Sequence, residues 1–189
     1  MADARSPLAH LDGATVIERD GVRLAENPDA GKVNLRGDAG DAVWLAAIQA
    51  AVEIDLPQAP NTSTETPPLS ALWLAPDEWM LVCADGSEGD VVASLEGAVA
   101  EFHASVVDVT DARTVFRLSG AGARNLLAKG CALDLHPRAF GLGDVAQTML
   151  AKAAVILHQT TDDADEAGPV FDIYVLRSFA DYLWSWLTD

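Results

Sequence analysis

The sequence NLRG at residues 34–37 returns as RLSG at residues 117–120, and in both places a strand-like run ends and a helix-like segment follows. The first copy leads into WLAAIQ, then ALWLA and EWMLVCA; the second leads into NLLAKG, then QTMLA and FDIYV. A further amphipathic segment closes each half. Connections of hairpin length exclude an all-parallel sheet. The sequence therefore predicts an α+β fold of two related halves, residues 1–103 and 104–189, each an antiparallel sheet with helices packed on one face, closely packed as one unit.

Local signals place several elements within this frame. Asp20-Gly21, between TVIER and VRLAE, favours the positive φ angles of a two-residue hairpin turn. Apolar residues at helical spacing predict a helix over residues 38–53. The stretch DLPQAPNTSTETPPLS, residues 55–70, is rich in Pro, Thr and Ser and is expected to form a loop. Gly130 is expected to end the preceding helix in the left-handed conformation.

Composition excludes several classes of function. The 189 residues are 50% hydrophobic, which is ample for a buried core, and carry a formal charge of −17. Such a charge repels phosphate backbones and anionic lipid, so neither nucleic acid nor a membrane is an expected partner. Cys83 and Cys131 form no framework of spacings and are expected to be free thiols. With no leader-like N-terminus and no apolar run long enough to cross a bilayer, the protein is expected in the cytoplasm.

The densest group of reactive side chains lies in LAKGCALDLHPRAF, residues 127–140, which brings Cys131, Asp134 and His136 within six positions. A metal site needs further ligands at familiar spacing, and none follow. A nucleophilic thiol needs a lowered pKa, whereas the end of a helix raises it. The stretch is therefore expected to be a structured connector, with Asp134 accepting hydrogen bonds from loop amides.

Other polar residues have ordinary structural explanations. Asp108 and Asp111 in VDVTDAR resemble an acid/base pair, but turns select Asp for its own hydrogen bonds. The histidines at 10, 103 and 158 stand alone in sequence, and the acidic run of residues 162–166 reads as the solvated tip of a hairpin. GLGDVAQ does not open a helix after a strand, so it is not a phosphate loop. The residues predict no catalytic, cofactor-binding or metal-binding site.

The final helix, SFADYLWSWL, carries the candidate interface. Its apolar stripe is expected to contain five residues: Phe179, Tyr182, Leu183, Trp186 and Leu187. Trp184 lies well off this stripe, and an outward Trp is a candidate anchor for a partner, together with Arg177 and Tyr182. The alternative is that Trp184 packs under the loop of residues 55–70.

A family resemblance runs through almost the whole chain. The sequence resembles the gamma subunit of heterotetrameric sarcosine oxidase in seven stretches: SPLAHL (6–11), LPQAPNT (56–62), ALWLAPDEWMLV (71–82), VDVTDART (107–114), LSGAGARNLLAKGCALDLHPRAF (118–140), AQT (146–148) and RSFADYLWSWL (177–187). The resemblance implies alpha, beta and delta subunits as partners. It implies oxidative demethylation of sarcosine to glycine by the complex, with the one-carbon unit passed to tetrahydrofolate. FAD, FMN, NAD and zinc are expected on the other subunits and no cofactor on this chain.

The second half also resembles the folate-binding domain of glycine-cleavage T proteins, through VDVTD, RLSG and QTMLAKAAVILHQ. T proteins place an acidic pair in the hairpin after the QTML-like strand, where this chain has Ala153, Ala154, Val155 and Ile156. The resemblance therefore implies a T-protein-like scaffold without its chemistry, and the chain is expected to be a non-catalytic structural subunit. The alternative is a free-standing folate-binding or one-carbon transfer protein, with Asp108, Asp111 or Asp134 as the pocket carboxylate.

Overall fold

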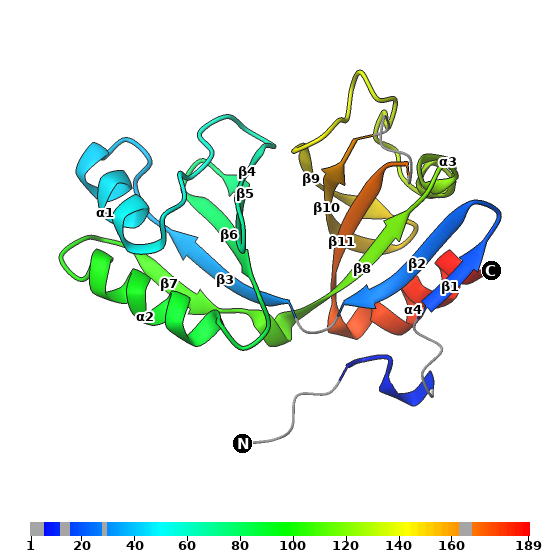
Figure 1. Cartoon of the computed structure of the whole chain (residues 1–189), viewed down its shortest axis with the longest axis horizontal. Helices are drawn as coiled ribbons and strands as arrows, with labels where there is room; N and C mark the ends of the chain where they lie inside the picture. The colour runs from blue at the N-terminus through cyan, green and yellow to red at the C-terminus, as the bar shows by residue number, and fades with distance from the viewer. Residues whose placement is uncertain (1–5, 12–15, 28–29, 163–167) are drawn as a thin grey trace. The chain divides into compact units, whose positions relative to one another are not determined.

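The chain forms two antiparallel sheets, each covered on one face by α-helices, which confirms the predicted α+β class (Figure 1). The structure, a computed structural model, describes residues 6–11, 16–27, 30–162 and 168–189. Among these residues, 30–110 form one compact unit, while those up to 27 and from 111 onward form a second unit. Each unit has its own hydrophobic core.

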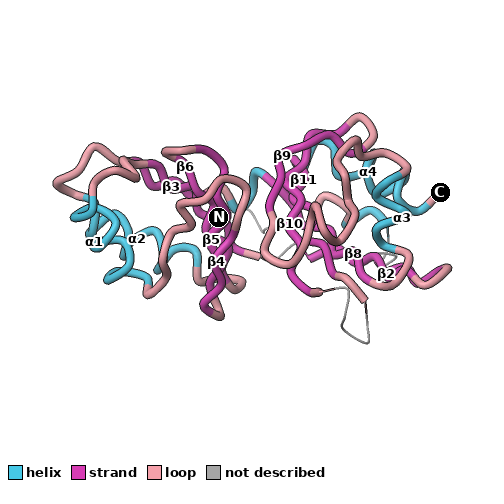
Figure 2. Tube along the Cα trace, turned by 90° about the horizontal axis from the view of Figure 1, so that it is seen from above, coloured by secondary structure: helices cyan, strands magenta, loops and turns pink. Residues whose placement is uncertain are grey.

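The unit of residues 30–110 is a five-stranded sheet in the order β4-β5-β6-β3-β7. Its elements are β3 (Gly31–Arg36), α1 (Ala42–Val52), β4 (Ser63–Thr66), β5 (Leu69–Ala75), β6 (Glu78–Cys83), α2 (Glu88–Val99) and β7 (Ser105–Asp108). The helices α1 and α2 lie side by side (Figures 1 and 2). The core joins their apolar faces to one face of the sheet, with Trp44 of α1 tilted against Trp79 of β6 at 5.5 Å between ring centroids.

The helix α1 begins later than residue 38, where the sequence placed its start. Asp41 is its N-cap: the carboxylate accepts hydrogen bonds from the backbone N–H groups of Val43 (2.8 Å) and Trp44 (3.2 Å). An Asp at this position satisfies donors that have no partner inside the helix, which fixes the first turn. Glu53 ends the helix with a left-handed backbone (φ 57°).

The second unit is a six-stranded sheet in the order β1-β2-β8-β11-β10-β9. Its elements are β1 (Val16–Arg19), β2 (Val22–Asn27), β8 (Arg113–Ser119), α3 (Ala123–Ala128), β9 (Val145–Leu150), β10 (Ala153–Thr161), β11 (Val170–Leu176) and α4 (Arg177–Thr188). Short 3-10 helices occupy Ala9–Leu11 and Thr110–Ala112. The core buries Leu127 of α3 and Leu183 of α4 against strand residues such as Phe116 and Ile173.

The sequence placed the boundary between the two halves at residues 103 and 104, and the structure divides the chain differently. The hairpin β1–β2 forms at Asp20-Gly21, as predicted, but β2 pairs with β8, and Leu24 enters the core of the second unit. Gly120 (φ +106°) permits this close approach, because a Cβ atom there would lie 2.2 Å from the Gly21 carbonyl oxygen. At the other boundary, β7 pairs with β3 and so remains with the first unit.

The internal repeat is visible in the topology and is longer than the sequence suggested. The series β3-α1-β4-β5-β6-α2 corresponds to β8-α3-β9-β10-β11-α4, and the sheet orders β4-β5-β6-β3 and β9-β10-β11-β8 agree. The expectation of a loop over residues 55–70 is wrong for Ser63–Thr66, which form β4 and pair with β5. This edge strand has no apolar side chain, so its composition gave no sign of a strand.

Two further expectations can be compared only with the residues that the structure describes. The acidic run of residues 162–166 lies outside them except for Asp162, which follows β10. Among the described residues, no helix has the length and apolar character needed to cross a membrane.

Candidate functional site

The connector after α3 is held in shape by Arg124. Its Nη1 donates to the carbonyl oxygens of Leu135 and Phe140, the latter at 3.0 Å, and its Nη2 donates to Oε1 of Gln159 at 2.9 Å. The guanidinium also lies 5.2 Å from the ring centroid of Phe171. One half-buried cation thus ties both ends of a loop to the sheet, as a structured connector requires.

The polar residues of the loop serve its own backbone. The Asp134 carboxylate accepts the His136 N–H (3.0 Å), and the His136 Nδ1 accepts the Arg138 N–H (3.2 Å). The Asp144 carboxylate accepts the Gly141 N–H at 2.7 Å. These bonds fix two consecutive turns and agree with the role expected for Asp134.

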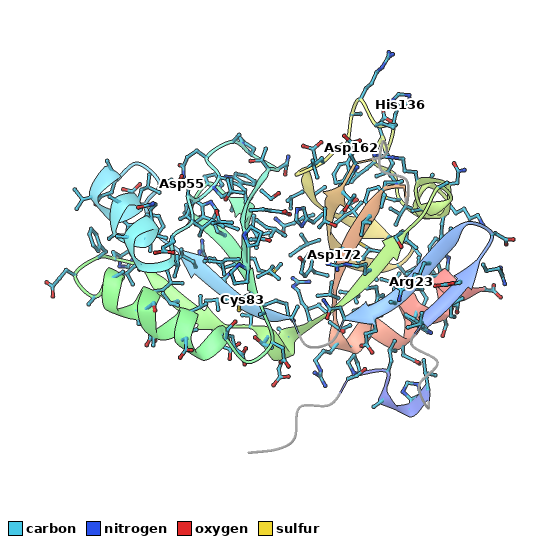
Figure 3. The ribbon with its side chains drawn as sticks, in the orientation of Figure 1. Arg23, Asp55, Cys83, His136, Asp162 and Asp172 are labelled. Carbon is cyan, nitrogen blue, oxygen red and sulfur yellow. The ribbon has the colours of Figure 1, made fainter. Side chains whose placement is uncertain are left out.

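The sequence cluster does not come together as a reactive site. The Cys131 side chain is buried, with its Sγ 3.9 Å from the Thr148 hydroxyl, whereas Asp134 and His136 are exposed. His136 lies on the outer part of the loop (Figure 3). In the part of the chain that the structure describes, no group of three or more His, Cys, Asp or Glu residues could hold a metal ion.

The expectation for Gly130 is wrong. It is not among the glycines with positive φ, so it is no left-handed cap. The residue is small for a different reason: a Cβ atom at Gly130 would lie 2.6 Å from the Trp186 ring. The close packing of α4 on the end of α3 selects glycine there, and only the tertiary structure reveals it.

The acidic residues singled out in turns are engaged in local bonds. The Asp108 carboxylate accepts the Thr110 N–H at 2.9 Å, and Asp111 pairs with Arg177 at 3.3 Å. Asp77 pairs with Arg36 at 2.6 Å. These carboxylates are exposed, so they lack the burial that tunes a general acid or base.

Sequence reasoning missed a row of ionisable groups across the centre of the second sheet. Arg117 on β8 stands opposite Asp172 on β11, and Asp172 stands opposite His158 on β10. The guanidinium and carboxylate form a two-pronged pair, Nε to Oδ1 at 2.8 Å and Nη2 to Oδ2 at 2.7 Å. The Asp172 side chain is 8% exposed, against 46% for Arg117. The signal available in sequence was an Asp inside the apolar run VFDIYVL.

His158 is the perturbed member of this row. Its exposure is 1%, and burial lowers the pKa of its imidazole to about 4, with Arg117 lowering it further and Asp172 opposing the shift. The imidazole is therefore neutral in the folded protein near pH 7. The row can stabilise the sheet, and because His158 is 1% exposed, its imidazole has no access to a substrate in the folded chain.

The helix α4 faces the core differently from the sequence prediction. Trp184 is 4% exposed and packs edge-on against Phe116, with 5.3 Å between ring centroids. The buried residues are Ala180, Leu183, Trp184 and Leu187. The prediction that Trp184 lies off the buried face is therefore wrong: the small Ala180 allows this side of the helix to approach the sheet. The Trp184 ring lies in the core of its own unit.

The outward face of α4 carries Phe179 (39% exposed) and Tyr182 (37% exposed), which the sequence had assigned to the buried stripe. The Tyr182 hydroxyl accepts the Lys152 N–H from the β9–β10 turn at 3.3 Å. Tyr182 and Arg177 thus remain candidates for an interface, while Trp184 contributes packing to the core.

Cys83 and Cys131 are both free and buried. Burial raises the pKa of the Cys83 thiol, and the nearby Glu88 and Asp108 carboxylates raise it further, against opposing effects of Ser87 and Lys32. A Cβ at Gly31 would lie 2.6 Å from the Cys83 sulfur, so the thiol fills a tight space. This is an inert packing thiol.

Several hollows occur in the second unit, and two of them bear on the candidate site. One, of about 320 Å³, lies over β9 and β10 and is lined by residues including Arg113, Gln147, Met149 and Ile156. The other, of about 220 Å³, lies between the β1–β2 hairpin, α3 and the end of α4, with a mainly aliphatic lining. No Asp or Glu lines the first hollow, so it offers no carboxylate for proton transfer.

Comparison with known proteins gives consistent results. The model of the sarcosine oxidase gamma subunit family matches residues 36–189. The sarcosine oxidase subunit gamma of Corynebacterium sp. (strain U-96) is 32% identical over 190 residues, covering 98% of this chain and 88% of the relative. The subunit gamma of Arthrobacter sp. is 36% identical over 165 residues, covering 85% of this chain and 79% of the relative.

Solved structures agree with the sequence comparison. A chain of the heterotetrameric sarcosine oxidase from Corynebacterium sp. U-96, in complex with pyrrole 2-carboxylate, superposes with a TM-score of 0.83 at 31% identity, covering 97% of this chain and 92% of that one. Aminomethyltransferase T of the Bartonella henselae glycine cleavage system gives a TM-score of 0.69 at 16% identity, over 98% of this chain and 57% of that one. The second likeness shows the T-protein-like fold alone.

Proposed function

The chain belongs to the sarcosine oxidase gamma subunit family, and from this premise we propose that it is a non-catalytic structural subunit of a heterotetrameric sarcosine oxidase. Support comes from relatives that match it along nearly its full length and from a related chain in a heterotetrameric oxidase. The proposed complex demethylates sarcosine oxidatively to glycine and passes the one-carbon unit to tetrahydrofolate. This chain contributes to the oxidoreductase by supporting its assembly.

The observation that carries the non-catalytic role is the composition of β10. The chain shares the fold of T proteins. That resemblance implies an acidic pair after the QTML-like strand, and here the hairpin continues as Ala153, Ala154, Val155 and Ile156. Ala153, Val155 and Ile156 are each at most 3% exposed. Aliphatic side chains at these positions have no group that transfers a proton. The residues present do not fit one-carbon transfer on folate.

The proposed partners are the alpha, beta and delta subunits, in the bacterial cytoplasm. FAD, FMN, NAD, zinc and tetrahydrofolate are assigned to those subunits, in line with the family resemblance. No cofactor is assigned to this chain, in line with the same resemblance.

The alternative is a free-standing folate-binding or one-carbon transfer protein. It would rely on Asp108, Asp111 or Asp134, and each of these carboxylates bonds a neighbouring backbone N–H or an arginine. Such engagement favours structural roles for all three. Tetrahydrofolate should therefore leave the melting temperature of the isolated chain unchanged, since only a ligand of the folded state raises it.

The test is a pull-down of the tagged chain from native lysate, recording the flavin absorbance of the eluate and the masses of the co-eluting proteins. The proposal predicts a yellow eluate with two large companions and one small one. A colourless eluate of this chain alone would overturn the proposal and return attention to folate binding.

A further inference from the structure

The loop of residues 134–144 has the construction of a preformed binding element. It stands beyond the ends of β9–β11 (Figure 1) and is built from two consecutive turns. Arg124 bonds two of its carbonyl oxygens, and Asp134, His136 and Asp144 each accept a backbone N–H within it. A loop fixed in one conformation loses little entropy on binding, so its contacts contribute fully to affinity.

The loop presents an apolar side chain and a cation to solvent. Leu142 is 59% exposed, one of the most exposed large hydrophobic side chains of the described residues. Arg138 is exposed, and within the described residues its guanidinium forms no ion pair. By contrast, the loop carboxylates of Asp134 and Asp144 already accept backbone hydrogen bonds. Arg is enriched at interface hot spots, and burial of the exposed Leu142 side chain by a partner would add hydrophobic stabilisation.

The charge of the chain restricts what can cover this loop. With 29 acidic side chains against 12 basic ones, a second copy would be repelled by the net charge of −17. Arg138, which forms no ion pair among the described residues, can pair with a carboxylate on a different protein. Arg117 is also exposed, but its guanidinium is already paired with the Asp172 carboxylate.

We propose that the loop of residues 134–144 is a docking element for another subunit of the oxidase, which receives Leu142 in an apolar hollow and Arg138 on an adjacent carboxylate. The inference rests on the proposed function, because it names a surface for the assembly proposed above. The clamps of Arg124, Asp134 and Asp144 hold the loop ready for that contact.

The experiment is competitive incorporation in cells. A tagged variant and the untagged wild-type chain are co-expressed with limiting alpha, beta and delta subunits, and the ratio of the two gamma chains is measured by mass spectrometry in the complex and in total lysate. The test variants are Arg138→Glu and Leu142→Ser. The matched controls are Lys129→Glu, an exposed cation on the same unit, and Val43→Ser, an apolar residue 69% exposed. Thermal melting of each purified variant verifies folding.

The expected result is about tenfold less incorporation for each test variant and near-equal incorporation for both controls. Equal incorporation of all variants, with the wild-type chain present in the complex, would overturn the docking inference and leave the subunit proposal standing. A wild-type chain absent from the complex would overturn both. If Arg138→Glu alters only self-association of the chain in sedimentation, the occupant is a second copy and the assignment to another subunit fails.

Discussion

Replacing His158 with Gln should remove one source of the loss of stability of this chain in acid. His158 is 1% exposed and faces the Asp172 carboxylate across β10 and β11. Burial lowers the pKa of its imidazole from 6.5 to about 4. In the unfolded chain the imidazole regains its ordinary pKa, so between these two values the unfolded state binds more protons than the folded state.

The sign and size of the effect of pH on stability follow from the difference between the folded and unfolded pKa values of His158. The neutral imidazole contributes its full stabilisation above pH 6.5, and the contribution is lost as the pH falls toward 4. Linkage between these pKa values gives a loss in the free energy of unfolding of about 2 kcal/mol from pH 7 to pH 5, and about 3 kcal/mol to pH 4. Gln keeps the polarity and approximate size of the side chain but binds no proton in this range.

The assay is urea denaturation of the wild type and of His158→Gln at pH 7, 6 and 5. Most carboxylates titrate equally in both proteins, so the difference between the two curves isolates the imidazole. At pH 7 the variant should be the less stable protein, and by pH 5 the difference should have shifted in its favour by about 2 kcal/mol. A difference that stays constant across the three pH values would refute the claim that His158 is neutral in the folded sheet.

Three more outcomes are expected. Trp184→Ala should lower the free energy of unfolding by about 3–5 kcal/mol, because it empties a core position, while Tyr182→Ala on the outward face of α4 should cost less than about 1 kcal/mol in the same urea titration. Arg124→Met should cost about 2–3 kcal/mol and speed amide hydrogen exchange in the loop of residues 134–144, since carbonyl oxygens lose their donor; unchanged exchange would contradict the clamp. A thiol reagent at pH 8 should modify Cys83 at least about tenfold more slowly in the native chain than in urea, because the thiol is buried and its pKa is raised.

Local signals predicted much of the fold because they do not depend on distant partners. The Asp20-Gly21 turn and the helix capped by Asp41 follow from backbone preferences of a few residues. The antiparallel class followed from connection length. The strand Ser63–Thr66 was not predicted, because an edge strand made only of Ser, Thr and Glu has no apolar pattern.

Features that depend on tertiary contacts could not be predicted in this way. In α4, a stripe through Phe179, Tyr182 and Trp186 and a stripe through Ala180 and Trp184 are both consistent with helical spacing, and only the fit against the sheet selects the second. The unit boundary depends on the pairing of β2 with β8, which joins distant segments.

The ionic row could not be predicted for the same reason. Arg117, Asp172 and His158 lie on three strands, and the pairing register alone makes them neighbours. The structural role of Asp134 was easier to anticipate, because turn rules place an Asp carboxylate on the backbone N–H two residues on, as it lies on that of His136.

The central claim is that this chain is a subunit without a cofactor of its own, and a native mass spectrum of the complex purified through it tests that claim most directly. The account predicts one assembly of four different chains, from which this chain is ejected at its sequence mass of 19.9 kDa with no added mass. A chain that is found alone, or that leaves the complex with a flavin or folate attached, would contradict it.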